Sequence, residues 1–208
     1  MKISVLSESP ADEEAIYGLA EAVLGRAVDR VAPRRQRPGG VNGVLNELPA
    51  VIKELHFHTD VEALIVVVDS DDTPAHETSH DQQLDGECRY CRLTQIVRSV
   101  HLPRRASGPL LQVGIGVAVP AIEAWYLCGT DPHIVEAPFV RAVGTGNLLA
   151  HSRNQLKVKA YGTDRPSVAL QMERARLAIS RLTPQIGLLE AAFPRGFGRL
   201  ADEMRRWI

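Results

Sequence analysis

Acidic side chains stand at three places in this chain where they could bind a metal ion together. Asp69 and Asp71, one residue apart, follow a strongly apolar run, and Glu8 follows another near the start of the chain. Glu123 lies a few residues beyond a third apolar run. Crowded carboxylates repel one another unless a proton or a cation neutralises them, and hard oxygen ligands suit Mg²⁺ or Mn²⁺. If the fold gathers these acids, they predict a divalent-metal site.

Each acid also has a plainer interpretation as part of a turn or a helix start. Asp and Ser are common turn formers after a strand, so Asp69-x-Asp71 taken alone is a weak motif. Glu123 could be a carboxylate stabilised by the dipole of a helix N-terminus. The matching positions of Glu8 and Glu123, each after an apolar run, favour the metal-binding interpretation.

A second candidate metal site lies in the polar segment after Asp71. His76, His80, Cys88 and Cys91 have the spacing His-x3-His-x7-Cys-x2-Cys. A Cys-x2-Cys pair can turn both thiolates toward one tetrahedral ion, and a structural zinc ion would hold together a segment that has no core of its own. Chance occurrence in a loop is the simpler alternative. A redox dithiol is a third, although that motif normally opens a helix after a strand, whereas here a polar loop is expected.

The elements that must position these residues alternate between strands and helices. Four segments have strand character: Lys2 to Ser7, Ala27 to Val31, Ala63 to Val68 and Leu110 to Val119. The third is continuously apolar, which is typical of a parallel strand covered on both faces. Helical patterns lie between the strands, with Ser9 as N-cap and Gly25 as C-terminal stop of the first helix. This order predicts an α/β fold with a small, mostly parallel sheet and helices on both faces.

The carboxyl ends of the strands are where ligands of such sheets bind, and all three acidic positions fall there. We expect residues 1–130 to form this core, with the His/Cys segment as an insertion at 73–95 and a short helix over Ile96 to Leu102. From Pro166 onward apolar residues recur at helical spacing. Residues 131–208 are therefore expected to form a mostly helical extension packed on the core.

Composition and charge limit the classes of partner. The formal net charge is −1, so no global attraction draws the chain to nucleic acid or to an anionic membrane. Three cysteines do not describe a disulfide framework, no apolar run approaches the ~20 residues of a membrane span, and the start of the chain is unlike a secretory signal. We therefore expect a cytoplasmic protein without membrane contact. Basic residues cluster only locally, at Arg34, Arg35 and Arg37, at Arg104 and Arg105, and at Arg153, Lys157 and Lys159.

Several short motifs, together spanning most of the chain, resemble an uncharacterised TOPRIM-like family related to the OLD-type nucleases of bacterial defence systems. Ser7-Glu8-Ser9 resembles the TOPRIM start, in which Gly stands where this chain has Ser9, and Asp69-Ser70-Asp71 resembles the TOPRIM Asp-x-Asp. The family's Pro-x-(Ile/Val)-Glu-Ala-Trp segment is similar to Pro120-Ala121-Ile122-Glu123-Ala124-Trp125. Later pieces that also look like the family are Leu156-Lys157, Tyr161-Gly162 and Phe193-Pro194-Arg195-Gly196-Phe197.

The resemblance implies a function and a role for each matching residue. It implies a metal-dependent nuclease or phosphodiesterase with DNA or RNA as substrate, in which Glu8 is the catalytic or metal-bridging acid and Asp69 and Asp71 are the Mg²⁺ or Mn²⁺ ligands. Glu123 would be an additional acid. Lys157 would contact phosphate, although an ordinary surface lysine is the simpler interpretation. Metal ions in such sites activate water and stabilise charge on the phosphate.

Three alternatives to an autonomous nuclease stay open. The first is a TOPRIM-like subunit that binds metal and an ATPase partner protein but has no activity alone. The second is a phosphatase, because Asp69-Ser70-Asp71-Asp72-Thr73 fits the Asp-x-Asp-x-Thr pattern of haloacid-dehalogenase-like enzymes. The third is a sugar-nucleotide transferase, although the chain before Asp69 is short for a nucleotide-binding half. The oligomeric state is also open, a homo-oligomer included.

Overall fold

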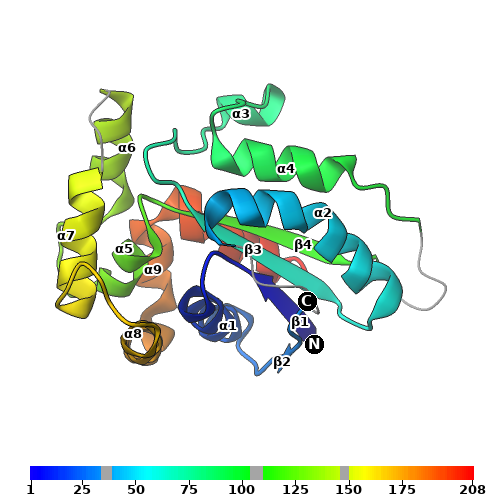
Figure 1. Ribbon diagram of the computed structural model, residues 1–208, viewed down its shortest axis with the longest axis horizontal. Coiled ribbons are helices and arrows are strands. Elements are labelled where there is room, and N and C mark those ends of the chain that lie inside the picture. Colours follow the sequence, from blue (N-terminus) through cyan, green and yellow to red (C-terminus); the bar gives the residue numbers. More distant parts are fainter. Residues whose placement is uncertain (34–38, 104–109, 146–149) are drawn as a thin grey trace.

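The computed structural model describes residues 1–33, 39–103, 110–145 and 150–208 (Figure 1). Two of the basic clusters noted in the sequence lie outside these described residues, namely Arg34, Arg35 and Arg37, and Arg104 and Arg105. Among the described residues, no helix combines the length and the apolar character needed to cross a membrane.

A four-stranded, fully parallel sheet forms the centre of the fold, as the alternation of elements predicts. Its strand order is β2-β1-β3-β4, and β1 and β3 pair with Leu6 opposite Val66. At the carboxyl end of the neighbouring pair, Asp69 of β3 stands opposite Ala118 of β4. The strands are β1 (Lys2–Leu6), β2 (Asp29–Arg30), β3 (Ala63–Asp69) and β4 (Gln112–Ala118).

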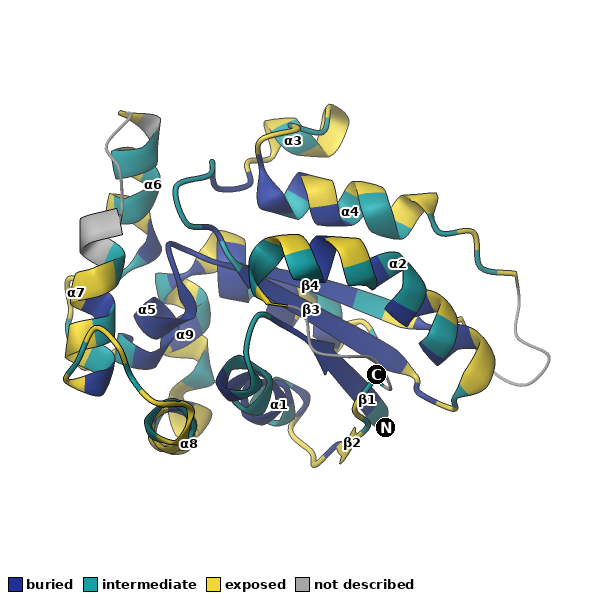
Figure 2. Ribbon diagram, viewed as in Figure 1, coloured by how far each residue is buried: buried dark blue, intermediate teal, exposed yellow. Residues whose placement is uncertain are grey.

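Helices cover both faces of the sheet, which explains why β3 is apolar throughout. Leu64 and Val66 of β3 point into one hydrophobic cluster with α2 (Gly40–His58) and α4 (Arg89–Ser99). Ile65 and Val67 point into the other, with α1 (Pro10–Leu24), α5 (Ile122–Leu127) and the C-terminal helices. Figure 2 shows β1, β3 and most of β4 as buried, β2 as exposed, and exposed residues on the outer sides of the helices. The predicted α/β architecture is confirmed.

The turn from β1 into α1 is built by local capping. Ser9 is the N-cap of α1, and its side-chain oxygen accepts a hydrogen bond from the backbone N–H of Asp12. Gly25 ends the helix in the left-handed conformation, with φ of 65°, which a residue without Cβ adopts at little cost. The cap places Glu8 at the carboxyl end of β1.

The C-terminal part is helical, as predicted, and packs on the sheet. Its elements are α6 (Glu136–Gly144), α7 (Ala150–Tyr161), α8 (Val168–Leu182), η1 (Thr183–Gln185), α9 (Ile186–Ala192), η2 (Pro194–Gly198) and α10 (Arg199–Arg205). Leu200 and Met204 of α10 belong to the same hydrophobic cluster as Ile3 and Val67 of the sheet. A Cβ on Gly116 of β4 would come within 2.8 Å of Leu200, so glycine lets α10 approach the sheet closely.

The region between β3 and β4 differs from the prediction. The expected short helix over Ile96 to Leu102 is instead α4, which begins after Cys88 and ends at Ser99. Leu93 of this helix is fully buried in the cluster that α4 shares with α2. The Cys-x2-Cys therefore opens a helix rather than lying in a polar loop. Before it, the segment contains only the short helix α3 (Ser79–Gln82), none of whose residues is buried.

Candidate metal centres

Acids from separate segments meet at the carboxyl edge of the sheet, as the parallel topology requires. Glu8 follows β1, and one of its carboxylate oxygens accepts a hydrogen bond from the backbone N–H of Asp69, 3.0 Å away. Asp69, the last residue of β3, accepts in turn from the backbone N–H of Ile122 at 2.9 Å. Because Ile122 opens α5, this bond brings the helix that carries Glu123 to the end of β3.

The carboxyl groups of Glu8, Asp12, Asp69 and Glu123, here called the acid edge, destabilise one another's charges. Burial, followed by the charges of Glu123, Asp12 and Glu8, raises the pKa of Asp69. Burial together with Glu123 and Glu8 raises the pKa of Asp12 to about 7. The pKa of Glu8 is raised by burial and by Asp71, and burial also raises that of Glu123. The edge therefore favours protons or a cation over four free carboxylates.

Helix α7 contributes one predicted residue and one unpredicted residue to this edge. The charge of Lys157 lowers the pKa of Glu123, although burial raises it more. Tyr161 is hydrogen-bonded to the Glu123 carboxylate. The other oxygen of Glu123, Oε2, is buried without a hydrogen-bond partner, and so is the hydroxyl of Tyr126. The acids also raise the pKa of Tyr126, after burial, so this hydroxyl lies in their field.

Asp71 is held by two arginines beside the acid edge. Arg89 of α4 donates to its Oδ2 at 2.5 Å, and Arg153 of α7 donates to Oδ1. Arg89 also donates to the backbone carbonyl of Asp69, and Arg153 lies 3.5 Å from Asp72. Asp71 has a left-handed backbone with φ of 50°, which aspartate tolerates better than most residues. Its carboxylate is thus in an ion pair, whereas the sequence predicts a metal ligand there.

The second predicted site brings its four side chains together. One ligand atom from each of His76, His80, Cys88 and Cys91 lies within 4.8 Å of the others. His76 Nδ1 is 3.4 Å from Cys91 Sγ and 3.9 Å from Cys88 Sγ, and both cysteines are free. In the part of the chain that the structure describes, this is the one such group of three or more residues. The His/Cys cluster could bind a metal such as zinc.

The histidines of the His/Cys cluster are oriented by carboxylates on their outer side. His76 Nε2 is 3.1 Å from Asp81 Oδ1, and Asp81 is also bonded to Arg199 of α10 at 2.7 Å. His80 Nε2 is 3.6 Å from Asp85. Carboxylates that accept from the outer nitrogen of a metal-binding histidine are common, because they fix the ring and raise its basicity.

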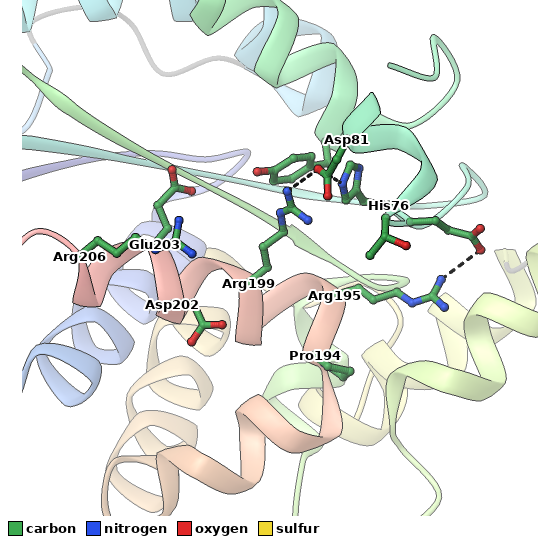
Figure 3. Close-up of a pocket in the computed structure, with 11 residues that line it drawn as sticks. His76, Asp81, Pro194, Arg195, Arg199, Asp202, Glu203 and Arg206 are labelled. Atoms are coloured by element: carbon green, nitrogen blue, oxygen red, sulfur yellow. Dashed lines mark hydrogen bonds and ion pairs between the residues drawn. The ribbon is translucent and has the colours of Figure 1, made fainter. Parts of the chain in front are cut away.

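A cleft of about 600 Å³ lies between the His/Cys cluster and the C-terminal helices (Figure 3). Its charged groups pair across it, Arg199 with Asp81 and Arg195 with Glu77. The two arginines and the two acids of these pairs therefore neutralise each other. Its walls are His76, Glu77, Thr78, Asp81, Tyr90, Pro194, Arg195, Arg199, Asp202, Glu203 and Arg206.

Several residues at these centres were not among the predicted site residues. Asp12 could have been predicted, because Asp12 and Glu123 each stand in the first turn of a helix that follows a strand of the sheet. Arg89 lies between the two cysteines, but nothing in its spacing indicates Asp71 as its partner. Tyr161 enters only as part of a segment that resembles the family, and no sequence signal indicates a role for Tyr126. Comparisons with models of protein families, with curated proteins and with solved structures find no match for this chain.

Proposed function

We propose that the acid edge binds Mg²⁺ or Mn²⁺ and that the protein is a metal-dependent phosphodiesterase, with nucleic acid as the leading substrate class. One observation carries the proposal: four carboxyl groups, from the turn after β1 and from α1, β3 and α5, interact at the carboxyl edge of a parallel sheet and have raised pKa values. That edge is where sheets of this kind bind ligands. The TOPRIM resemblance of Glu8 and Asp69-x-Asp71 supports the same reaction class.

In the described residues, no three carboxylates of the acid edge form a group of mutually close ligand atoms, so an ion there would have a small number of direct protein ligands. Asp69 and Glu123 are the strongest candidates, because Glu123 is the largest charge acting on the pKa of Asp69. Glu8 is engaged by the backbone N–H groups of Asp69 and Val41, so its charge would act from the outer side. Mg²⁺ commonly uses one or two carboxylates and keeps several waters. The unpartnered Glu123 Oε2 and Tyr126 hydroxyl are further polar groups that hydrated metal would satisfy.

The side chains around the edge have complementary tasks. When bound, the ion would supply positive charge to the phosphate and acidify water. Asp12, whose pKa is raised to about 7 in the metal-free protein by burial and the neighbouring acids, would be the general base that accepts a proton from water. Arg153 and Lys157 lie on the same helix and would bind phosphate oxygens. Because Arg153 is already paired with Asp71 and Asp72, phosphate would have to compete with these acids for it.

Hydrolysis assays with matched variants test this proposal. Wild type should cleave DNA or RNA in the presence of Mg²⁺ or Mn²⁺, and chelator should stop the cleavage. The cleavage rate of Asp69→Asn should be at least about 100-fold lower, because removing one positioned charge from an active site has an effect of this size. Asp29→Asn is the control. Asp29 is an exposed residue of β2 that lies opposite Lys2, at the amino end of β1, so the variant should retain full activity. Equal rates for Asp69→Asn and wild type would refute the proposal. Cleavage of a simple phosphate monoester alone would favour the phosphatase.

A second candidate is a metal-binding subunit that acts only with an ATPase partner. This candidate is favoured by the ion pairs that Asp71 forms with Arg89 and Arg153, because they leave Asp71, a predicted ligand, unavailable to a metal ion. This candidate predicts that Mg²⁺ raises the melting temperature of wild type but not of Asp69→Asn, while no nucleic acid is cleaved. If Mg²⁺ neither raises the melting temperature of wild type nor supports cleavage, both candidates are contradicted.

A further inference from the structure

The His/Cys cluster surrounds a point at the start of α4. Cys88 is the N-cap residue of α4 and Cys91 lies in its first turn, while His80 belongs to α3. Cys88 and Cys91 are each 1% exposed and His76 is 6% exposed. The four side chains therefore face a protected position between α3 and α4, and two sulfurs with two imidazoles form one of the usual donor sets of tetrahedral zinc.

The imidazoles are already turned for coordination through one nitrogen each. His76 presents Nδ1 to the sulfurs and Nε2 to Asp81. His80 presents Nε2 to Asp85, and its Nδ1 is buried without a hydrogen-bond partner. A buried imidazole nitrogen without a partner is unfavourable, so its position points to a missing ligand.

The segment has little else to hold it in place. From residue 71 to residue 87 the buried residues are Ala75 and His76, and α3 buries none. A segment without an apolar core gains its order from bonds to an ion or from contacts to its neighbours.

Those neighbours are reached from the cluster itself. Arg89, between the two cysteines, donates to the Asp69 carbonyl and to the Asp71 carboxylate. On the other side Asp81 joins His76 to Arg199, whose guanidinium stacks over Tyr90 at 4.5 Å from the ring centroid. In Figure 3 Arg199 reaches from the C-terminal helix to Asp81 and His76.

We infer that His76, His80, Cys88 and Cys91 bind one Zn²⁺ through both sulfurs and both Nδ1 atoms, and that this ion positions Arg89 against the carboxyl end of β3. Each cysteine gives up its thiol proton to solvent when zinc binds. The zinc site is separate from the acid edge, and its existence does not depend on the proposed phosphodiesterase activity. Asp81 is a positioning residue, because it acts through His76.

Metal content tests the site directly. Protein purified without chelator should contain about one zinc per chain, the stoichiometry of a closed four-ligand structural site, and Cys91→Ala should lose it. Cys128→Ala is the matched control, because Cys128 is equally buried and free but lies in the hydrophobic cluster that the C-terminal helices share with the sheet. Absence of zinc from wild type, or equal zinc in Cys91→Ala, would overturn the site.

Cobalt substitution tests the coordination without a variant that could fail to fold. Wild type reloaded with Co²⁺ should show thiolate-to-cobalt charge-transfer absorption and the intense visible bands of a tetrahedral ion. Asp81→Asn should weaken zinc binding about 10- to 100-fold, the usual effect of losing an outer carboxylate. Asp202→Asn, which changes an acid of the same cleft that contacts Arg205, should bind zinc like wild type. A cobalt spectrum without thiolate bands would overturn the assignment.

Hydrogen exchange tests the positioning of Arg89. Removing zinc from wild type should speed amide exchange in residues 69–73 and in the first turn of α4, while α8 and α9 keep their rates. Unchanged exchange at residues 69–73 would overturn the link between the ion and Arg89. Equally fast exchange in β1 would overturn it too, because it would reveal loss of the whole fold.

Discussion

At the scale of single residues, the acid edge is distinguished by the raised pKa values of its four carboxyl groups. Asp12 is the clearest member, since its pKa of about 7 puts its protonation in the physiological range. The main cause is burial, and Ser9 opposes it through a hydrogen bond. The neighbouring charges of Glu123, Glu8 and Glu13 raise the pKa further.

This raised pKa predicts a pH dependence of stability with a definite sign. Below about pH 4 the Asp12 carboxyl is protonated in both the folded and the unfolded protein. Between about pH 4 and pH 7 only the folded protein keeps this proton. The contribution of Asp12 to folding stability is therefore lost as the pH rises through this range. The melting temperature of metal-free Asp12→Asn, relative to wild type, should therefore rise between about pH 4 and pH 7 and then level off. Thermal melts at several pH values would measure it. The same pH trend in Asp29→Asn would contradict this explanation.

At the scale of elements, α1 and α8 are packed through a contact that admits no extra methyl group. A Cβ on Gly18 of α1 would lie 2.4 Å from Ile179 of α8. Glycine inside a helix normally lowers stability, so close packing accounts for its presence here. This contact helps to hold the C-terminal helices against the core.

Gly18→Ala should therefore destabilise the protein, although alanine is the better helix former. Overpacking costs about 1–3 kcal/mol and the gain in helix propensity is about 1 kcal/mol. Adding Ile179→Ala should remove much of the overpacking, so the two changes should be non-additive in denaturant unfolding. Gly187→Ala, in α9 with nothing within 4 Å of the added Cβ, should be neutral or stabilising. A stabilised Gly18→Ala protein would contradict the packing argument.

Elements specified by local signals were predicted well. The continuous apolar run of β3 indicated a strand covered on both faces, and Ser9 and Gly25 marked the ends of α1. The start of α4 was missed, because its N-cap is Cys88 and its helical pattern depends on Leu93 packing with α2, which no local signal reveals.

The candidate sites divide in the same way. Glu8 and Asp69 could be placed together because parallel strands bring their carboxyl ends to one edge, and the His/Cys cluster could be predicted from spacing. The partners of Asp71 could not, because Arg89 and Arg153 come from helices whose positions depend on tertiary packing. Asp12 was assigned only to a helix start, since sequence does not show how deeply a first-turn carboxyl is buried.

At the scale of the whole molecule, the sheet and the C-terminal helices share one hydrophobic cluster. Ile3 and Val67 of the sheet, Trp125 of α5, and Phe197 and Leu200 near the C-terminus all belong to it. Trp125 and Phe197 meet edge to face, with ring centroids 5.3 Å apart. Residues 131–208 therefore have no separate core among the described residues.

We accordingly expect the described parts of the chain to unfold together. Calorimetry of the zinc-loaded protein should give a single transition whose calorimetric and van 't Hoff enthalpies agree, as for a two-state domain. Two resolved transitions, or native-like melting of residues 1–130 alone, would contradict the shared cluster.

The close fit of α10 on β4 also bears on how the chain is made. Gly114 and Gly116 present no side chains, and Trp207 and Leu200 fill the space above them. During translation β4 leaves the ribosome long before α10, so that face of the sheet stays uncovered while the intervening helices are made. Nascent chains with exposed apolar surface and unfinished sheets aggregate readily. Chaperones that hold such surfaces should therefore stay bound until residues 199–207 have been synthesised.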